Sequence, residues 1–106
     1  MKEDSKFVKK VHIEFLEDLV KQAGLELDKD KCWEDGQDNY RIFSSEKNPR
    51  FLGRVYLTED GKNVRSVQIN YRWRLPSKVY QSIFSFYGVL YENNIQRKII
   101  LPSCQL

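Results

Sequence analysis

The residues that could carry out chemistry are few and widely separated in this sequence. His12 is the single histidine, and Cys32 and Cys104 stand far from it and from each other, unlike the closely spaced ligands of a zinc site. A Ser-His-Asp or Cys-His site would have to use His12, and no Gly-x-Ser-x-Gly segment is present to expose a serine. We therefore predict that the chain is not an enzyme and that it holds no metal and no cofactor.

An acidic segment over residues 28–38 has the composition of a cation-binding loop. An EF-hand loop places oxygen ligands at its first, third and fifth positions and glycine at its sixth. Counted from Asp28, the fifth and sixth positions are Cys32 and Trp33, so the segment does not fit this motif. We interpret it as a solvated connection, in which Trp33 either packs back onto the core or anchors a partner.

The strongest candidate for a binding site is a group of arginine, amide and aromatic side chains in the second half of the chain. Arginine offers planar donors to phosphate or carboxylate groups, and amides bond to base edges or to peptide groups. Several of these residues recur at every second position, which is the spacing of one face of a β-strand. The candidate partner-binding residues are Arg54, Tyr56, Gln68, Asn70, Arg72, Arg74 and Lys78, and we place Leu52 beside them.

The distribution of charge favours this half of the chain as the place for an anionic partner. Residues 1–50 contain ten Lys and Arg against twelve Asp and Glu, whereas residues 51–106 contain eight against three. The net charge of the whole chain is only +3, which solubility alone would also explain.

The candidate side chains share a surface only if two neighbouring segments pair as a hairpin. Apolar and polar residues alternate over 51–57 and again over 66–75, the pattern of two strands that each bury one face. A two-residue turn centred on Asp60 and Gly61 would set Arg54 opposite Val67 and turn an arginine toward the core.

A three-residue loop closed by a glycine bulge gives a better register. It sets Gly53 opposite Val67 and Phe51 opposite Ile69, so that apolar positions meet. Because a shift of one residue turns every side chain to the other face, hydrophobic matching favours this loop. We therefore expect the odd-numbered positions of both strands to face the core, and Arg65 remains as a mismatch.

An amphipathic helix is predicted over residues 6–23, where apolar residues recur at steps of three and four. Asp4 or Ser5 is its expected N-cap, and Gly24 is placed to end it in a left-handed conformation. Residues 25–39 show no sustained period, so we expect a connection with a short extended piece at most.

The remaining elements are two strands and a second helix. Residues 40–44 are rich in strand formers and predict the first strand. A broad apolar stripe predicts a helix over 78–92, with Ser77 as its N-cap and with Gly88 packed closely against a neighbour. Residues 97–101 predict a last strand.

The order of these elements is helix, strand, hairpin, helix, strand. We predict an α+β fold in which an antiparallel sheet of about four strands carries two helices on one face, in the order α-β-β-β-α-β. A chain of 106 residues fits one domain, so residues 1–106 are expected to form a single unit. The other face of the sheet is then left to solvent or to a partner.

In the order of its elements, the segment 7–93 resembles the double-stranded RNA-binding domains, whose layout is helix, three strands, helix. That family contacts phosphates through a lysine-rich start of its second helix. Here the corresponding segment, Pro76-Ser77-Lys78-Val79-Tyr80-Gln81, has a single lysine, and a final strand is added. The resemblance is therefore one of layout.

Two binding functions are compatible with these features. The first is a protein-binding module that docks on a larger protein partner, such as a small inhibitor or immunity-type protein of a phage or mobile element. Small size and abundant aromatic and arginine side chains favour it. The alternative is nucleic-acid binding through a basic and aromatic sheet face, against which the moderate pI of about 8.9 counts.

The sequence also bears on location. No apolar stretch approaches the roughly 20 residues needed to span a bilayer, and no secretory signal is recognisable near Met1. We expect a cytoplasmic protein that has no membrane partner and keeps its cysteines reduced. The sequence leaves the oligomeric state open.

Overall fold

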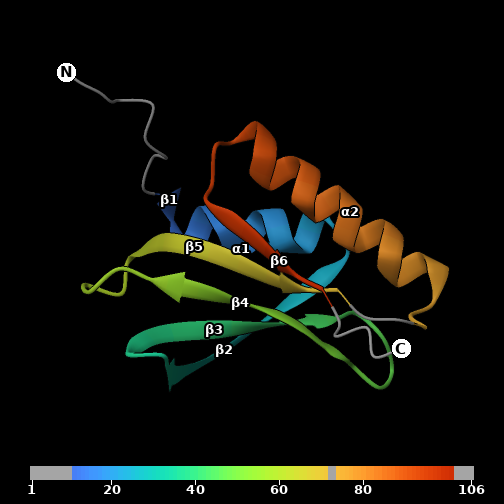
Figure 1. Ribbon diagram of the computed structural model, residues 1–106, viewed down its shortest axis with the longest axis horizontal. Coiled ribbons are helices and arrows are strands. Elements are labelled where there is room, and N and C mark those ends of the chain that lie inside the picture. Colours follow the sequence, from blue (N-terminus) through green and yellow to red (C-terminus); the bar gives the residue numbers. More distant parts are fainter. Residues whose placement is uncertain (1–10, 72–73, 102–106) are drawn as a thin grey trace.

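The computed structural model describes residues 11–71 and 74–101 of the chain. Within them, two helices lie on one side of a six-stranded sheet (Figure 1). The predicted α+β class is confirmed, but the sheet has six strands instead of about four. The elements are β1 (Val11–His12), α1 (Ile13–Gln22), β2 (Leu25–Glu34), β3 (Gln37–Ser44), β4 (Phe51–Leu57), β5 (Asn63–Asn70), α2 (Ser77–Glu92) and β6 (Arg97–Ile100).

The strands of the sheet follow the order β1-β5-β4-β3-β2, and β6 also pairs with β5. All pairs are antiparallel except β5 and β6, which run parallel. The short β1 pairs with residues 63–64 of β5, whereas β6 pairs with residues 67–70 along the same edge. The predicted order α-β-β-β-α-β therefore lacked β1 and β2.

Helix α1 begins later than the sequence predicts. Val11 and His12 are extended and pair with β5, and the Nδ1 atom of His12 accepts the backbone N–H of Glu14 at 3.1 Å. His12 is thus the N-cap of the helix, while the expected caps Asp4 and Ser5 lie outside the described residues. At its other end, Gly24 has a φ of 84°, which confirms the predicted left-handed stop.

The segment predicted as a connection forms β2 and the start of β3. Asp35 and Gly36 join these strands with φ values of 55° and 75°, as a tight hairpin turn requires. Six of the ten residues of β2 are charged, so the segment lacks the sustained apolar alternation that predicts a strand. A strand at the edge of a sheet tolerates such charges, because one side of it faces water.

The hairpin of β4 and β5 keeps the predicted parity but not the predicted register. Gly53 lies opposite Ile69 and Val55 opposite Val67, two positions from the predicted pairing. The connecting loop is longer than expected, since the N–H of Thr58 bonds to the carbonyl of Asn63 at 2.9 Å. Odd-numbered residues of the paired segments therefore still face the core, as a shift by two preserves the face.

The mismatch at Arg65 is resolved by a bulge. Tyr56 pairs with Ser66 and Leu57 pairs with Val64, so Arg65 has no partner across the ladder. The extra residue turns Val64 inward, where it is buried, and leaves Arg65 exposed.

A second bulge, in β4, reverses two predicted orientations. Ile42 pairs with Gly53 and Phe43 pairs with Phe51, so Leu52 is the extra residue. Leu52 points into the core and is 2% exposed, instead of lying beside the candidate binding residues. Phe51 lies instead on the opposite face, where its ring contacts Phe43 at 6.0 Å between centroids.

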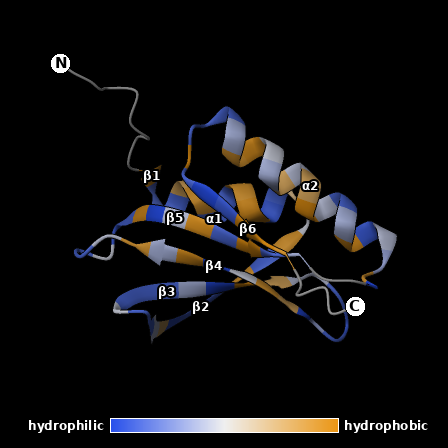
Figure 2. Ribbon diagram, in the orientation of Figure 1, coloured by the Kyte–Doolittle hydropathy of each residue, from blue (hydrophilic) through white to orange (hydrophobic). Residues whose placement is uncertain are grey.

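The core lies between the helices and the inner face of the sheet. Figure 2 shows apolar segments along both helices and along the strands beneath them. Because side chains three and four residues apart share a helix face, each helix buries one stripe against the sheet. The completely or almost completely buried apolar residues include Leu16, Val20, Ile42, Val55, Val67, Ile83, Phe86, Leu90 and Ile95.

Helix α2 follows the predicted bounds closely. Its first residue is Ser77 and its N-cap is Pro76, so the predicted Ser77 cap is wrong by one position. The close packing predicted at Gly88 is also wrong, because a Cβ atom there would meet no heavy atom within 4 Å beyond its chain neighbours and the backbone of its own helix.

Candidate partner-binding surfaces

The outer sheet face is the face of the sheet that points away from the two helices. Four of the predicted binding residues lie together on it: Arg54, Tyr56, Gln68 and Asn70. Arg54 pairs across the ladder with Gln68, and Tyr56 is the next residue but one on the same strand. The parity of the hairpin therefore gathers these side chains as the sequence analysis predicts.

The other predicted residues are less closely grouped. Arg74 is exposed just beyond the sheet and has a φ of 64°. Lys78 is in the first turn of α2 and lines an open hollow of about 430 Å³ together with Gly24 and Ser82. This hollow involves the helix layer and not the outer sheet face. Arg72 lies outside the described residues.

Arg54 is engaged within the fold. Its Nη1 donates to Oδ1 of Asn39 at 3.0 Å, and its Nη2 lies 2.8 Å from Oε1 of Glu34. The guanidinium also stacks over the ring of Phe51, 5.0 Å from its centroid. Because the side chain is only 17% exposed, little of its charge is left for a partner.

A second arginine on the same face is neutralised in the same way. Arg41 on β3 donates to a carboxylate oxygen of Asp28 on β2 at 2.7 Å, and its guanidinium lies 5.9 Å from the ring of Phe43. Sequence reasoning missed Arg41, Asp28 and Glu34 because it treated most of this hairpin as a loop. The signal that could have found them is the Asp-Gly pair at 35–36, which is typical of a two-residue hairpin turn.

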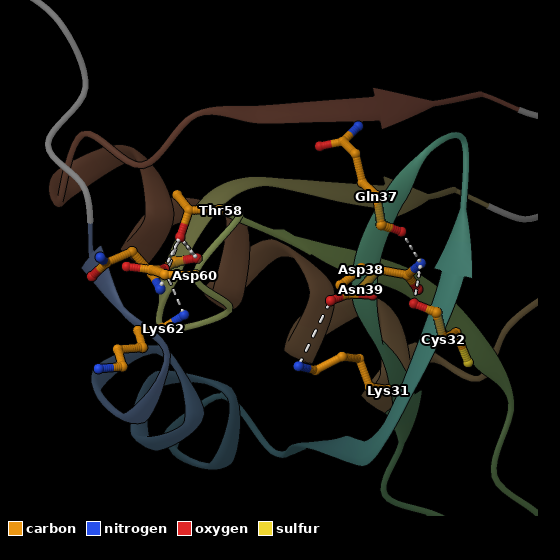
Figure 3. A network of polar contacts seen from close by, with 9 residues as sticks. Lys31, Cys32, Gln37, Asp38, Asn39, Thr58, Asp60 and Lys62 are labelled. Atoms are coloured by element: carbon orange, nitrogen blue, oxygen red, sulfur yellow. Dashed lines mark hydrogen bonds and ion pairs between the residues drawn. The ribbon is translucent and has the colours of Figure 1, made fainter.

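Tyr56 and Asn39 form a buried polar contact region near the β2–β3 turn. Asn39 is completely buried, and its Nδ2 faces the backbone carbonyls of Cys32 at 3.3 Å and Gln37 at 3.5 Å (Figure 3). Tyr56 is 6% exposed, and burial together with the nearby Asp35 raises the pKa of its hydroxyl. These groups support the hairpin and offer a partner little surface.

Helix α2 carries aromatic rings beside its buried stripe, and Tyr80 among them still packs partly against the core. Tyr80 and Phe84 stack with 6.3 Å between ring centroids, and Tyr71 lies 5.4 Å from Tyr80. Phe84 is 58% exposed despite these contacts. The broad apolar stripe that predicts this helix is only partly buried, since Val79, Ile83, Phe86 and Leu90 are its buried residues.

Further apolar side chains lie on β6 and beside it. The guanidinium of Arg97 lies 4.7 Å from the centroid of Tyr91 and 5.4 Å from that of Tyr87, so that it joins the strand to α2. Ile99, Ile100 and Leu101 follow and are partly or largely exposed. Ile100 pairs with Asn70 and so lies on the outer sheet face. We call the following residues the α2–β6 surface: Phe84, Tyr87, Tyr91, Arg97, Ile99 and Leu101.

Trp33 lies on β2, the strand at the other edge of the sheet. Its side chain is 71% exposed, so the predicted packing onto the core is wrong and the alternative of a partner anchor stays a prediction.

Residues 11–71 and 74–101 show neither a metal-binding cluster nor a membrane-spanning helix. No three His, Cys, Asp or Glu side chains of this part of the chain are grouped so that they could hold a metal ion. Neither of the helices described is long and apolar enough to cross a membrane.

We also compared the chain with models of protein families, with curated proteins and with solved structures, and none of these comparisons gave a match.

Proposed function

We propose that this chain is a non-enzymatic protein-binding module that docks on a larger protein through the α2–β6 surface. One observation supports this proposal above the others. Of the seven large apolar side chains that are exposed among the described residues, four belong to this surface. They are Phe84, Tyr91, Ile99 and Leu101.

Such a cluster suits a protein partner better than water. Exposed apolar side chains that are scattered singly need no explanation, whereas a group of them marks an interaction site. Tyrosine, phenylalanine and arginine are also enriched where binding energy concentrates. Arg97 holds the rings of Tyr87 and Tyr91 beside β6, so this surface is already ordered before a partner arrives.

A nucleic acid is the second candidate, and the outer sheet face is the feature that favours it. Phe43, Phe51, Arg41 and Arg54 lie together there, and rings beside arginines can stack on bases. Affinity for phosphates, however, requires cations that are not already paired. Since Glu34 and Asp28 compensate the two arginines, we favour the protein partner.

The test is affinity capture with the tagged chain from nuclease-treated lysate of the source cells. The wild-type chain should retain one stoichiometric protein, and the double variant Phe84→Ser, Tyr91→Ser should lose it. Phe15→Ser is the matched control, because Phe15 is an aromatic residue of α1 that is 46% exposed and lies outside the α2–β6 surface.

Two results would argue against the proposal. Retention of the captured protein by the double variant would remove the α2–β6 surface from its binding. If instead the chain shifts a labelled oligonucleotide and releases it steeply as salt rises, the partner is a nucleic acid.

A further inference from the structure

The sheet has two edges, and they differ in how they are protected. The edge formed by β2 has six charged residues among ten, and its pairing with β3 is irregular between Asp28 and Cys32. Charges and irregular pairing are the features by which proteins prevent other chains from adding to an edge. The short β6 has neither an irregular register nor a carboxylate, and its second half is Ile99 and Ile100.

The backbone of β6 presents hydrogen-bonding groups at this edge. The carbonyl of Gln96 accepts from Val67 at 2.9 Å, and the carbonyl of Ile100 accepts from Tyr71 at 2.8 Å. Even-numbered residues therefore direct their backbone groups toward β5. Because successive residues of a strand alternate, the N–H and C=O groups of Arg97 and Ile99 point to the other side. Among the described residues, no strand pairs with β6 on that side.

We infer that the β6 edge binds an extended segment of the partner protein as an added strand, with acidic side chains beside Arg97 and Lys98 and apolar side chains beside Ile99 and Ile100. The inference rests on the protein-binding function proposed above and specifies its partner. The backbone groups of Arg97 and Ile99 would provide the hydrogen bonds, and the side chains on the two faces would provide the selection.

The two halves of β6 favour different side chains in an added strand. In the first half, Arg97 and Lys98 are cationic and suit carboxylates. In the second half, Ile99 and Ile100 are 38% and 36% exposed and suit apolar neighbours. Because each position of β6 faces a neighbour on the added strand, a segment that satisfies both requirements has acidic residues in one half and apolar residues in the other.

Charge also distinguishes this partner from a second copy of the chain. Arg97 and Lys98 are half of the residues of β6 and are both cationic. Two copies that paired through β6 would bring these cations close together, whereas an acidic segment attracts them.

The test uses a fluorescein-labelled peptide of about seven residues, as long as an ordinary strand, with glutamates in one half and isoleucines in the other. Fluorescence anisotropy should show saturable binding to the full chain. A peptide with lysine in place of glutamate should bind at least about tenfold more weakly, because it meets Arg97 and Lys98. In a ¹⁵N spectrum, the amide signals of Arg97 and Ile99 should shift on addition of the glutamate peptide.

The variant Ile99→Pro tests the hydrogen bonding directly. It removes an N–H that β5 does not use and places a ring at the edge, so the affinity should fall about tenfold or more. Ile99→Val is the matched control, because it keeps the N–H, the β-branched shape and most of the apolar area. Thermal unfolding of both variants verifies that the fold is retained.

Three results would overturn the inference. They are the absence of saturation up to about 1 mM peptide, equal binding by Ile99→Pro and Ile99→Val, and equal binding of the two peptides.

A chain that is a dimer in solution and becomes a monomer on Ile99→Pro would assign the edge to a second copy. If Ile99→Pro retains the captured protein while Phe84→Ser, Tyr91→Ser loses it, strand addition fails and the protein-binding function stands.

Discussion

The guanidinium of Arg54 on β4 lies 2.8 Å from the carboxylate of Glu34 on β2, with β3 between the two strands. Arg54 also donates to Asn39 on that intervening strand. One side chain thus connects three strands, and its charge is compensated inside the fold. An arginine that the sequence suggests as a partner contact therefore also supports the β2–β3 hairpin.

The first prediction concerns this support. Arg54→Ala should lower the free energy of unfolding by about 1–3 kcal/mol, because the buried Oδ1 of Asn39 loses its donor and Glu34 loses its ion pair. Urea denaturation measures the change. Arg74→Ala is the control, since Arg74 is exposed and should change stability by less than about 0.5 kcal/mol. Equal effects of the two variants would mean that the Arg54 contacts contribute nothing specific.

The second prediction concerns two glycines in contrasting surroundings. Gly88→Ala should raise the free energy of unfolding by up to about 1 kcal/mol, because alanine is the better helix former and its Cβ meets no atom. Gly53→Ala should be strongly destabilising, since its Cβ would overlap the backbone carbonyl of Gln68 on the paired strand. Thermal unfolding distinguishes them, and a destabilised Gly88→Ala variant would contradict the open surroundings of this position.

The third prediction concerns alkaline pH. Burial, with Asp35 nearby, raises the pKa of the Tyr56 hydroxyl above its ordinary value of 10.0, so the fold favours the neutral form. This contribution to stability is complete below pH 10 and is lost as the pH rises through the raised pKa. Between about pH 8 and pH 11, the wild-type chain should therefore lose more stability than Tyr56→Phe. Parallel losses in urea denaturation at these pH values would exclude a role for Tyr56.

Much of the fold follows from alternation in the sequence, and the errors have identifiable causes. Hydrophobic matching places Val55, Val67 and Ile69 inward because a shift of the register by two residues preserves the face. Hydrophobic matching cannot show the bulge at Leu52, because the composition of the strand is the same with or without a bulge. In the structure, the bulge turns Leu52 inward and Phe51 outward.

The candidate site is predictable only in part for a related reason. The sequence groups Arg54, Tyr56, Gln68 and Asn70 on one face, as the structure has them. It does not reveal that Glu34 reaches Arg54, because the two residues meet only after β2 folds back along β3. The stripe of α2 is similarly ambiguous, since periodicity does not distinguish the buried Phe86 from the exposed Phe84.

The last prediction concerns the loop that joins β4 to β5 and so sets their register. One carboxylate oxygen of Asp60 accepts from the hydroxyl of Thr58 at 2.6 Å and from the N–H of Lys62 at 2.9 Å (Figure 3). The hydrogen bond from Thr58, followed by that from Lys62, lowers the pKa of Asp60 below its ordinary value of 3.8. Stability from these bonds is present above that value and is lost as the pH falls through the lowered pKa.

Two variants of Asp60 separate the charge from the hydrogen bonds. Asp60→Asn keeps an oxygen acceptor in place but does not titrate, so it should lose less stability than the wild-type chain between about pH 6 and pH 2. Asp60→Ala removes both acceptor and charge and should be the least stable of the three near neutral pH, where urea denaturation can compare them. If Asp60→Asn loses stability in acid as steeply as the wild-type chain, other carboxylates are responsible.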